Sequence, residues 1–80
     1  MRYIALTGAA VGPDGRRIPR SELVRRCRRA GLIVGNTVRP LTDTLVASRD
    51  DTRKARAAKL RGLKVASYLE LIAALEASGA

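Results

Sequence analysis

Two short stretches of the sequence have residue types that bind phosphate groups. Thr7 and Gly8 follow a short apolar run, so a hydroxyl and an accessible backbone N–H stand at the end of an expected strand. Thr52, Arg53 and Lys54 open an expected helix, where unpaired N–H groups and the helix dipole favour an anion. Each stretch by itself is also typical of an ordinary strand end or a solvated first turn. A cation at a helix N-terminus costs about 0.3–1 kcal/mol, however, and a bound anion would offset that cost.

The residues that most enzyme classes need are missing from the sequence. With no histidine and a single cysteine, a zinc site or a cysteine nucleophile paired with histidine is excluded. Neither the phosphate loop GxxxxGK(S/T) nor the dinucleotide pattern GxGxxG is present. The adjacent carboxylates Asp50 and Asp51 suit a helix cap better than a magnesium site. Cys27 falls at an apolar helical position, so we expect a small buried side chain. The sequence thus predicts no enzyme activity, no cofactor and no metal.

The net charge is strongly positive. Sixteen Lys and Arg against seven Asp and Glu give +9 over 80 residues. Such a field favours phosphate-rich partners: nucleic acid, phosphorylated protein or an anionic membrane surface. Most of the cations are arginines, whose planar fork pairs bidentately with phosphate. A GC-rich genome would also favour arginine over lysine, but it would not explain the excess of positive charge.

The elements that must position these residues alternate along the chain. A chain of 80 residues makes one domain, here residues 1–80, and its 46% apolar residues suffice for a core. Apolar runs predict strands at residues 3–6, 32–34, 44–47 and 63–66. Helical spacing predicts helices at residues 20–30, at 52–60 and after Ser67. The order β-α-β-β-α-β-α predicts an α/β fold, a parallel sheet with helices on both faces.

Helix ends and apolar faces also follow from the residue types. Caps are expected from Ser21 in the first helix, from Asp50 and Asp51 in the second, and from Ser67 with Glu70 in the last. Gly31 and Gly62 are expected to end the first two helices. The expected apolar residues of the second helix are Ala55, Ala58 and Leu60, and those of the last are Leu69, Leu71, Ile72 and Leu75. Because alanines bury little area, the second helix should be the least stable.

Taken in order, these features resemble a BRCT domain over about residues 2–77. The matching residues are Leu6-Thr7-Gly8, Arg20-Ser21-Glu22-Leu23, Ala30-Gly31, Thr42-Asp43-x-Leu45-Val46-Ala47, Thr52-x-Lys54, Ala58 and Gly62-Leu63-Lys64-Val65. The chain is most similar to the single bacterial repeats of NAD-dependent DNA ligases and of polymerase III epsilon-type exonucleases. The resemblance implies a three-layer sandwich: a four-stranded parallel sheet of order 2-1-3-4, with helices one and three on one face and helix two on the other.

The resemblance also implies a phosphate site. Members use a Ser or Thr and a Gly after strand one, and a Lys at the start of helix two, which correspond to Thr7, Gly8 and Lys54. Members that bind a 5′-phosphorylated DNA end add an Arg that opens helix one, here Arg20. Adjacent DNA backbone would be contacted by Arg16, Arg17, Arg25, Arg28 and Arg29.

The chain departs from the family in three places. The loop at residues 9–19 is longer than in ligase-type members, which bears on where Arg20 lies relative to Thr7. Tyr68 stands where the family usually has a tryptophan. A single repeat lacks the groove with which paired repeats read phosphopeptides.

We therefore expect a non-catalytic module of DNA repair or replication that binds a phosphate at a 5′ DNA end or nick. One alternative is a module that docks an acidic or phosphorylated repair or replication protein. Another is the terminal domain of a DNA ligase or exonuclease. No run approaches the ~20 apolar residues of a membrane span and no signal peptide is evident, so we expect no membrane partner and a cytoplasmic location.

Overall fold

The structure is a computed structural model that describes residues 1–79, and its elements follow the expected order. The strands are β1 (Tyr3–Thr7), β2 (Ile33–Gly35), β3 (Thr44–Ala47) and β4 (Lys64–Ala66), and the helices are α1 (Arg20–Arg29), α2 (Arg53–Leu60) and α3 (Tyr68–Ala77). Six boundaries differ from prediction by one residue. Among them, β1 ends at Thr7, β2 ends at Gly35 and α2 begins at Arg53. Leu32 and Leu63 precede their strands, and Ala30 is the C-terminal cap of α1.

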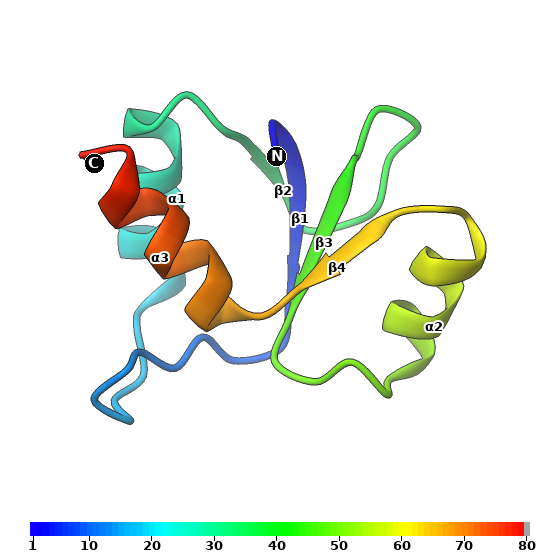
Figure 1. Cartoon of the computed structure of the whole chain (residues 1–80), viewed down its shortest axis with the longest axis horizontal. Coiled ribbons are helices and arrows are strands. Elements are labelled where there is room, and N and C mark those ends of the chain that lie inside the picture. The colour runs from blue at the N-terminus through cyan, green and yellow to red at the C-terminus, as the bar shows by residue number, and fades with distance from the viewer. Residues whose placement is uncertain (80) are drawn as a thin grey trace.

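The sheet has the predicted topology. All three strand pairings are parallel, and the order is β2-β1-β3-β4. Helices α1 and α3 lie on one face and α2 lies alone on the other, so the predicted three-layer α/β sandwich is confirmed (Figure 1). Because all four strands run in the same direction, their carboxyl ends meet at one edge of the sheet.

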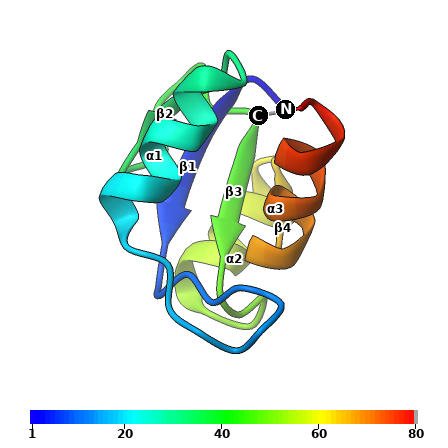
Figure 2. The same cartoon turned by 90° about the vertical axis from the view of Figure 1, so that its left-hand side faces the viewer.

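The two faces of the sheet have cores of different size. Figure 2 looks onto the face where α1 and α3 lie side by side. There Ile4, Leu6 and Val46 pack against Leu23 and Cys27 of α1 and against residues of α3, namely Tyr68, Leu71 and Leu75. On the other face, the buried apolar cluster is smaller and consists of Ala5, Leu45, Ala55 and Ala58. Alternation along β1 explains the division, since neighbouring side chains of a strand point to opposite faces.

Helix capping agrees with the sequence at α3 and differs at the other two helices. Ser67 Oγ accepts a hydrogen bond from Glu70 N, as predicted. The prediction for Ser21 is wrong, because α1 begins after Pro19 with no side-chain cap. The prediction for Asp50 and Asp51 is also wrong. Thr52 is the residue that directly precedes the helix, and its Oγ1 accepts from Ala55 N at 3.2 Å.

Two leucines predicted to be buried are exposed. Leu60 is 90% exposed, because α2 turns only its Ala55 and Ala58 side toward the sheet. Leu69 is 53% exposed, and Tyr68, one position earlier, takes the buried place on α3. Gly31 and Gly62 end α1 and α2 with positive φ, as expected.

The long loop before α1 folds back on itself. Val11 and Arg17 form an antiparallel bridge, Gly12 N donates to Arg16 O at 2.9 Å, and Ile18 N donates to Ala10 O at 2.9 Å. The additional residues therefore form a small hairpin that projects from the domain. Because the hairpin closes beside Ala10, the start of α1 returns to the carboxyl edge of the sheet.

Candidate phosphate-binding site

The candidate site lies at the carboxyl edge of the sheet. β1 ends there at Thr7, and α1, α2 and α3 all begin at that edge (Figure 1). The helices run back antiparallel to the strands, so the positive ends of their dipoles point the same way. Of the hollows along this edge, the two beside the end of β1 divide the predicted phosphate-binding residues between them. A third hollow, after β3 and β4, is lined by Arg49, Asp50, Asp51 and Glu70 among others and contains none of those residues.

The first hollow, the Lys54 hollow, has polar side chains from three segments of the chain. Thr7, Asn36, Lys54 and Arg61 line it over an apolar floor that includes Leu45 and Ala58. Its volume is about 240 Å³, and a water's share of the liquid is about 30 Å³, so an anion of the size of phosphate fits with part of its hydration. Thr7 and Lys54, which the sequence analysis placed in one site, both line this hollow, and Asn36 and Arg61 line it as well without having been expected there.

The second hollow, the Arg20 hollow, lies on the α1 and α3 side of β1. Gly8, Arg17 and Arg20 line it together with apolar residues, and its volume is about 300 Å³. The apolar part is supplied by Leu6, Ala9, Ala10, Ile18, Pro19, Leu23 and Tyr68. Of the predicted site residues, Gly8 and Arg20 thus line this second hollow rather than the one that Lys54 lines.

Arg20 joins the two hollows. Its Nη1 donates to Asn36 Oδ1 at 2.8 Å and reaches Leu6 O at 3.4 Å. Because Asn36 lines the Lys54 hollow, the guanidinium of Arg20 spans the end of β1 between the hollows. The long loop therefore leaves Arg20 beside Thr7, which the sequence left open. No local pattern in the sequence pairs Asn36 with Arg20.

Tyr68 holds the turn that contains Thr7 and Gly8. Its hydroxyl donates to Thr7 O at 2.9 Å and lies 3.3 Å from Gly8 O. Burial raises the pKa of this hydroxyl. The nearby Arg20 charge and the hydrogen bond to Thr7 lower the pKa by a smaller amount, so the pKa is raised overall. Tyr68 therefore stays protonated and remains a donor. The sequence analysis gave Tyr68 no hydrogen-bonding role, yet a tyrosine in an otherwise aliphatic core signals a hydroxyl that needs a partner.

Gly8 is required by backbone geometry. Its φ is +78°, and a Cβ at this position would collide with Ser48 Oγ. Gly8 follows β1 and Ser48 follows β3, so the two strand ends approach each other closely at the candidate site. The close approach gives a structural reason for this glycine that is independent of any ligand.

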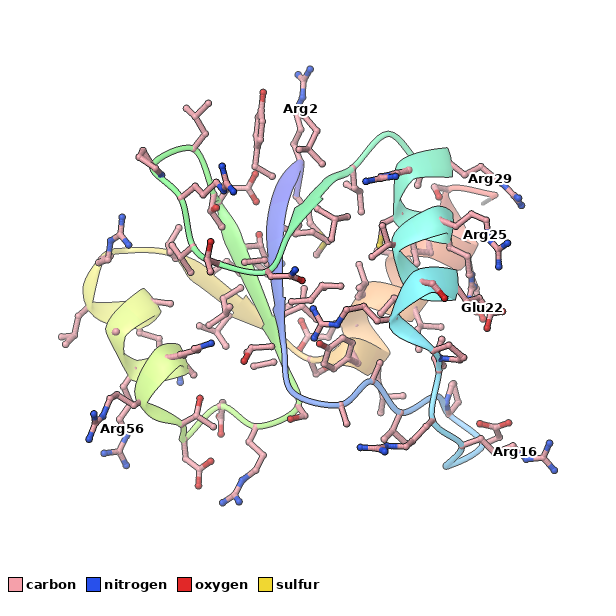
Figure 3. The ribbon with its side chains drawn as sticks, turned by 180° about the vertical axis from the view of Figure 1, so that it is seen from behind. Arg2, Arg16, Glu22, Arg25, Arg29 and Arg56 are labelled. Atoms are coloured by element: carbon pink, nitrogen blue, oxygen red, sulfur yellow. The ribbon has the colours of Figure 1, made fainter. Side chains whose placement is uncertain are left out.

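The arginines predicted to contact DNA backbone fall into two groups. Arg16 and Arg17 are on the projecting hairpin, where both line a separate hollow, and Arg17 also lines the Arg20 hollow. Arg25, Arg28 and Arg29 are exposed on the side of α1 opposite its buried residues. In Figure 3, Arg25 and Arg29 point away from the sheet, on the side opposite to α2. The structure thus does not bring the α1 arginines onto one surface with Lys54.

Residues 1–79 contain no cluster of three or more His, Cys, Asp or Glu side chains arranged to hold a metal ion. In the same part of the chain, no helix has the length and apolar character needed to cross a bilayer. Comparison with known proteins identified no matching family model, no matching curated protein and no matching solved structure.

Proposed function

We propose that this chain is a non-catalytic, BRCT-like module of DNA repair or replication that binds DNA through a phosphate held at the carboxyl edge of its sheet. The observation that supports this most directly is the Lys54 hollow, which is lined by Thr7 at the end of β1 and by Lys54 in the first turn of α2, together with Asn36 and Arg61. Within a ligase or exonuclease, such a module would hold DNA for a catalytic domain elsewhere.

Each residue has a defined role in this proposal. The Thr7 hydroxyl and the Lys54 ammonium donate to phosphate oxygens from opposite sides of the Lys54 hollow. Arg20 uses one of its five N–H donors on Asn36, which leaves others for a phosphate at the boundary of the hollows. Gly8 contributes accessible backbone. Charge-assisted hydrogen bonds of this kind contribute about 1.5–3 kcal/mol each.

A terminal phosphate suits these donors better than one within a strand. A phosphate monoester carries a charge of about −1.5 to −2 at neutral pH and presents three acceptor oxygens. An internal phosphodiester carries a single negative charge and is flanked by sugars on both sides. Donors that converge from several segments on one small hollow favour the monoester, which is the group at a 5′ end or nick.

The experiment compares Lys54→Ala on two duplexes that differ only in a 5′-phosphate or a 5′-hydroxyl. We expect about a tenfold or greater loss on the phosphorylated duplex and a much smaller loss on the other. Three or four phosphate contacts also predict a log–log salt slope of about −3 to −4 for the unsubstituted protein. Lys64→Ala is the matched control, because Lys64 is exposed at the start of β4 and lines neither hollow. Equal losses on both duplexes would reduce the proposal to general electrostatic attraction.

An apolar hollow at the opposite edge favours a second candidate, docking of a repair or replication protein. Tyr3, Ile33, Pro40 and Leu41 line a hollow of about 580 Å³ beside the edge strand β2. Ile33 is 50% exposed and Leu41 is 70% exposed. Arg39 in the same lining favours a partner that combines apolar and acidic or phosphorylated side chains. Leu41→Asp would abolish such docking and leave DNA binding unchanged, which calorimetry with each partner would measure.

A further inference from the structure

A second basic surface lies on α2, on the opposite side of the sheet from the α1 arginines. We define the α2 surface as Arg53, Arg56 and Lys59 of the helix together with Arg61, the residue that caps its C-terminus, all exposed. Side chains three or four positions apart share a helix face. Ala55 and Ala58 share the face that is buried against the sheet, and Arg53 and Arg56 share a face that points outward. The helix contains no acidic residue. The expected DNA contacts on α1 and the hairpin do not account for this surface.

The α2 surface has an electrostatic cost in the protein alone. Arg53, Arg56 and Lys59 follow one another at intervals of three residues, a spacing at which like charges repel. Arg53 also stands at the positive end of the helix dipole. Within residues 1–79 the carboxylate that approaches these cations is Asp50, 4.0 Å from Lys59 and itself exposed. Since α2 is held by only two buried alanines, a bound polyanion would stabilise it.

The α1 surface, defined as Arg25, Arg28 and Arg29, faces the other way. These residues lie opposite Leu23 and Cys27, which are buried against the sheet. In Figure 3, Arg25 and Arg29 project from one side of the domain and Arg56 from the other, with the sheet between them. The α1 and α2 surfaces thus form the two outer faces of the three-layer sandwich.

One duplex cannot contact both surfaces. The domain is 31 Å across its longest axis, whereas duplex DNA has a persistence length of about 500 Å. A bend of 40–90° over 20–30 base pairs already costs about 1–6 kcal/mol. To reach both outer faces of so small a body, a duplex would have to reverse direction almost completely within a few base pairs.

We propose that the α1 and α2 surfaces bind two separate DNA duplexes, so that a single domain bridges them. Arg61 belongs both to the α2 surface and to the lining of the Lys54 hollow. The duplex whose end phosphate enters the hollow therefore runs along α2, and the α1 surface takes the second duplex. This inference rests on the proposed function, since it assumes that DNA is the polyanion.

The test measures capture of one duplex by another. A duplex of about 20 base pairs, too short to bend around the domain, is immobilised, and a separate fluorescent duplex is added with the protein. We expect capture that rises and then falls as the protein concentration increases, because excess protein saturates each duplex separately. Sedimentation under the same conditions should give complexes of one protein with two duplexes.

Three double variants, each lacking two positive charges, locate the surfaces. R53Q/R56Q and R25Q/R29Q should each reduce capture by about tenfold or more, while each protein still binds a single duplex through its remaining surface. R2Q/R39Q is the matched control, because Arg39 lines the hollow at the opposite edge of the sheet and Arg2 adjoins β1 there. The control should capture as well as the unsubstituted protein. Circular dichroism checks that all the variants remain folded.

Each other outcome has a definite meaning. Binding of one duplex without capture of a second would overturn the bridging inference and leave the proposed function standing. Equal loss of capture in all three double variants would also overturn it, since general charge would then suffice. Capture that depends on the square of the protein concentration would assign bridging to a protein dimer instead. Failure to bind any duplex would overturn the proposed function itself.

Discussion

Substitution of Tyr68 by Phe tests whether a buried hydroxyl positions the candidate site. The hydroxyl donates to Thr7 O at 2.9 Å and lies 3.3 Å from Gly8 O, and the residue is 4% exposed. Phenylalanine retains the ring and its packing against the core on the α1 and α3 face. The substitution therefore removes the hydrogen bonding while leaving almost no cavity.

The expected magnitude follows from the burial of the acceptors. A hydrogen bond contributes about 0.5–1.5 kcal/mol, and a buried carbonyl left without a partner costs about 1–3 kcal/mol. Thr7 is half-buried and Gly8 is exposed, so water can reach at least one of the carbonyls. We expect a loss of about 1 kcal/mol, which lowers the melting temperature of a domain of this size by about 4–8 °C. If the loosened turn also misplaces the phosphate, affinity for a 5′-phosphorylated duplex falls about fivefold.

Calorimetry and urea unfolding would measure the stability, with Tyr3→Phe as the control. Tyr3 is partly exposed, and its hydroxyl makes no hydrogen bond within residues 1–79. The control should change stability by less than about 0.5 kcal/mol. A Tyr68→Phe protein as stable as the parent, with unchanged affinity for the phosphorylated end, would refute the positioning role.

The pH dependence provides an independent readout of Tyr68. Burial is the largest influence on its pKa, which is raised in the folded protein. A group whose pKa is raised on folding stabilises the protein fully below its unfolded pKa, here about 10. That contribution is lost as the pH rises above this value toward the folded pKa. The Tyr68→Phe protein should therefore lose less stability than the parent between neutral and strongly alkaline pH.

The remaining predictions concern three other positions. Gly8→Ala should lower the free energy of unfolding in urea by about 1–2 kcal/mol, because alanine tolerates the positive φ poorly. The collision of the new Cβ with Ser48 should lower it further, and adding Ser48→Gly to the same protein should remove that second loss. Burial raises the pKa of Asp43, but the Thr44 hydroxyl and the Tyr3 and Arg2 N–H groups together hold that pKa below its usual value. The stabilisation is therefore present above pH ~4 and lost as pH falls further, so Asp43→Asn should cost about 1 kcal/mol at neutral pH and flatten the acid limb of the stability curve. Cys27 is fully buried and burial raises its thiol pKa, so a thiol reagent at pH ~8 should label it only as fast as the domain opens.

A site residue could be predicted when a local sequence pattern marks it, and could not when its role depends on contacts with residues far away in the sequence. That Thr7 and Lys54 would lie near one another could be predicted, because both stand at the ends of strongly patterned elements and parallel strands bring such ends to one edge. Asn36 and Arg61 were missed, since a turn residue and a helix C-terminal residue have no local pattern that marks a site. Leu60 was wrongly grouped with Ala55 and Ala58, because a residue two positions after Ala58 points to the opposite side of a helix.

The sequence by itself determined the order of the elements, the mostly aliphatic composition of the core and the excess of positive charge. Periodicity, turn glycines and composition are local properties, and they are sufficient for those conclusions. Only the tertiary structure decided that Arg20 reaches Asn36, that Tyr68 holds the Thr7–Gly8 turn, and that the basic residues of α1 and α2 face opposite ways. Strand order and the course of the loop at residues 9–19 fix these relations, because each depends on segments that are distant along the chain but adjacent in space.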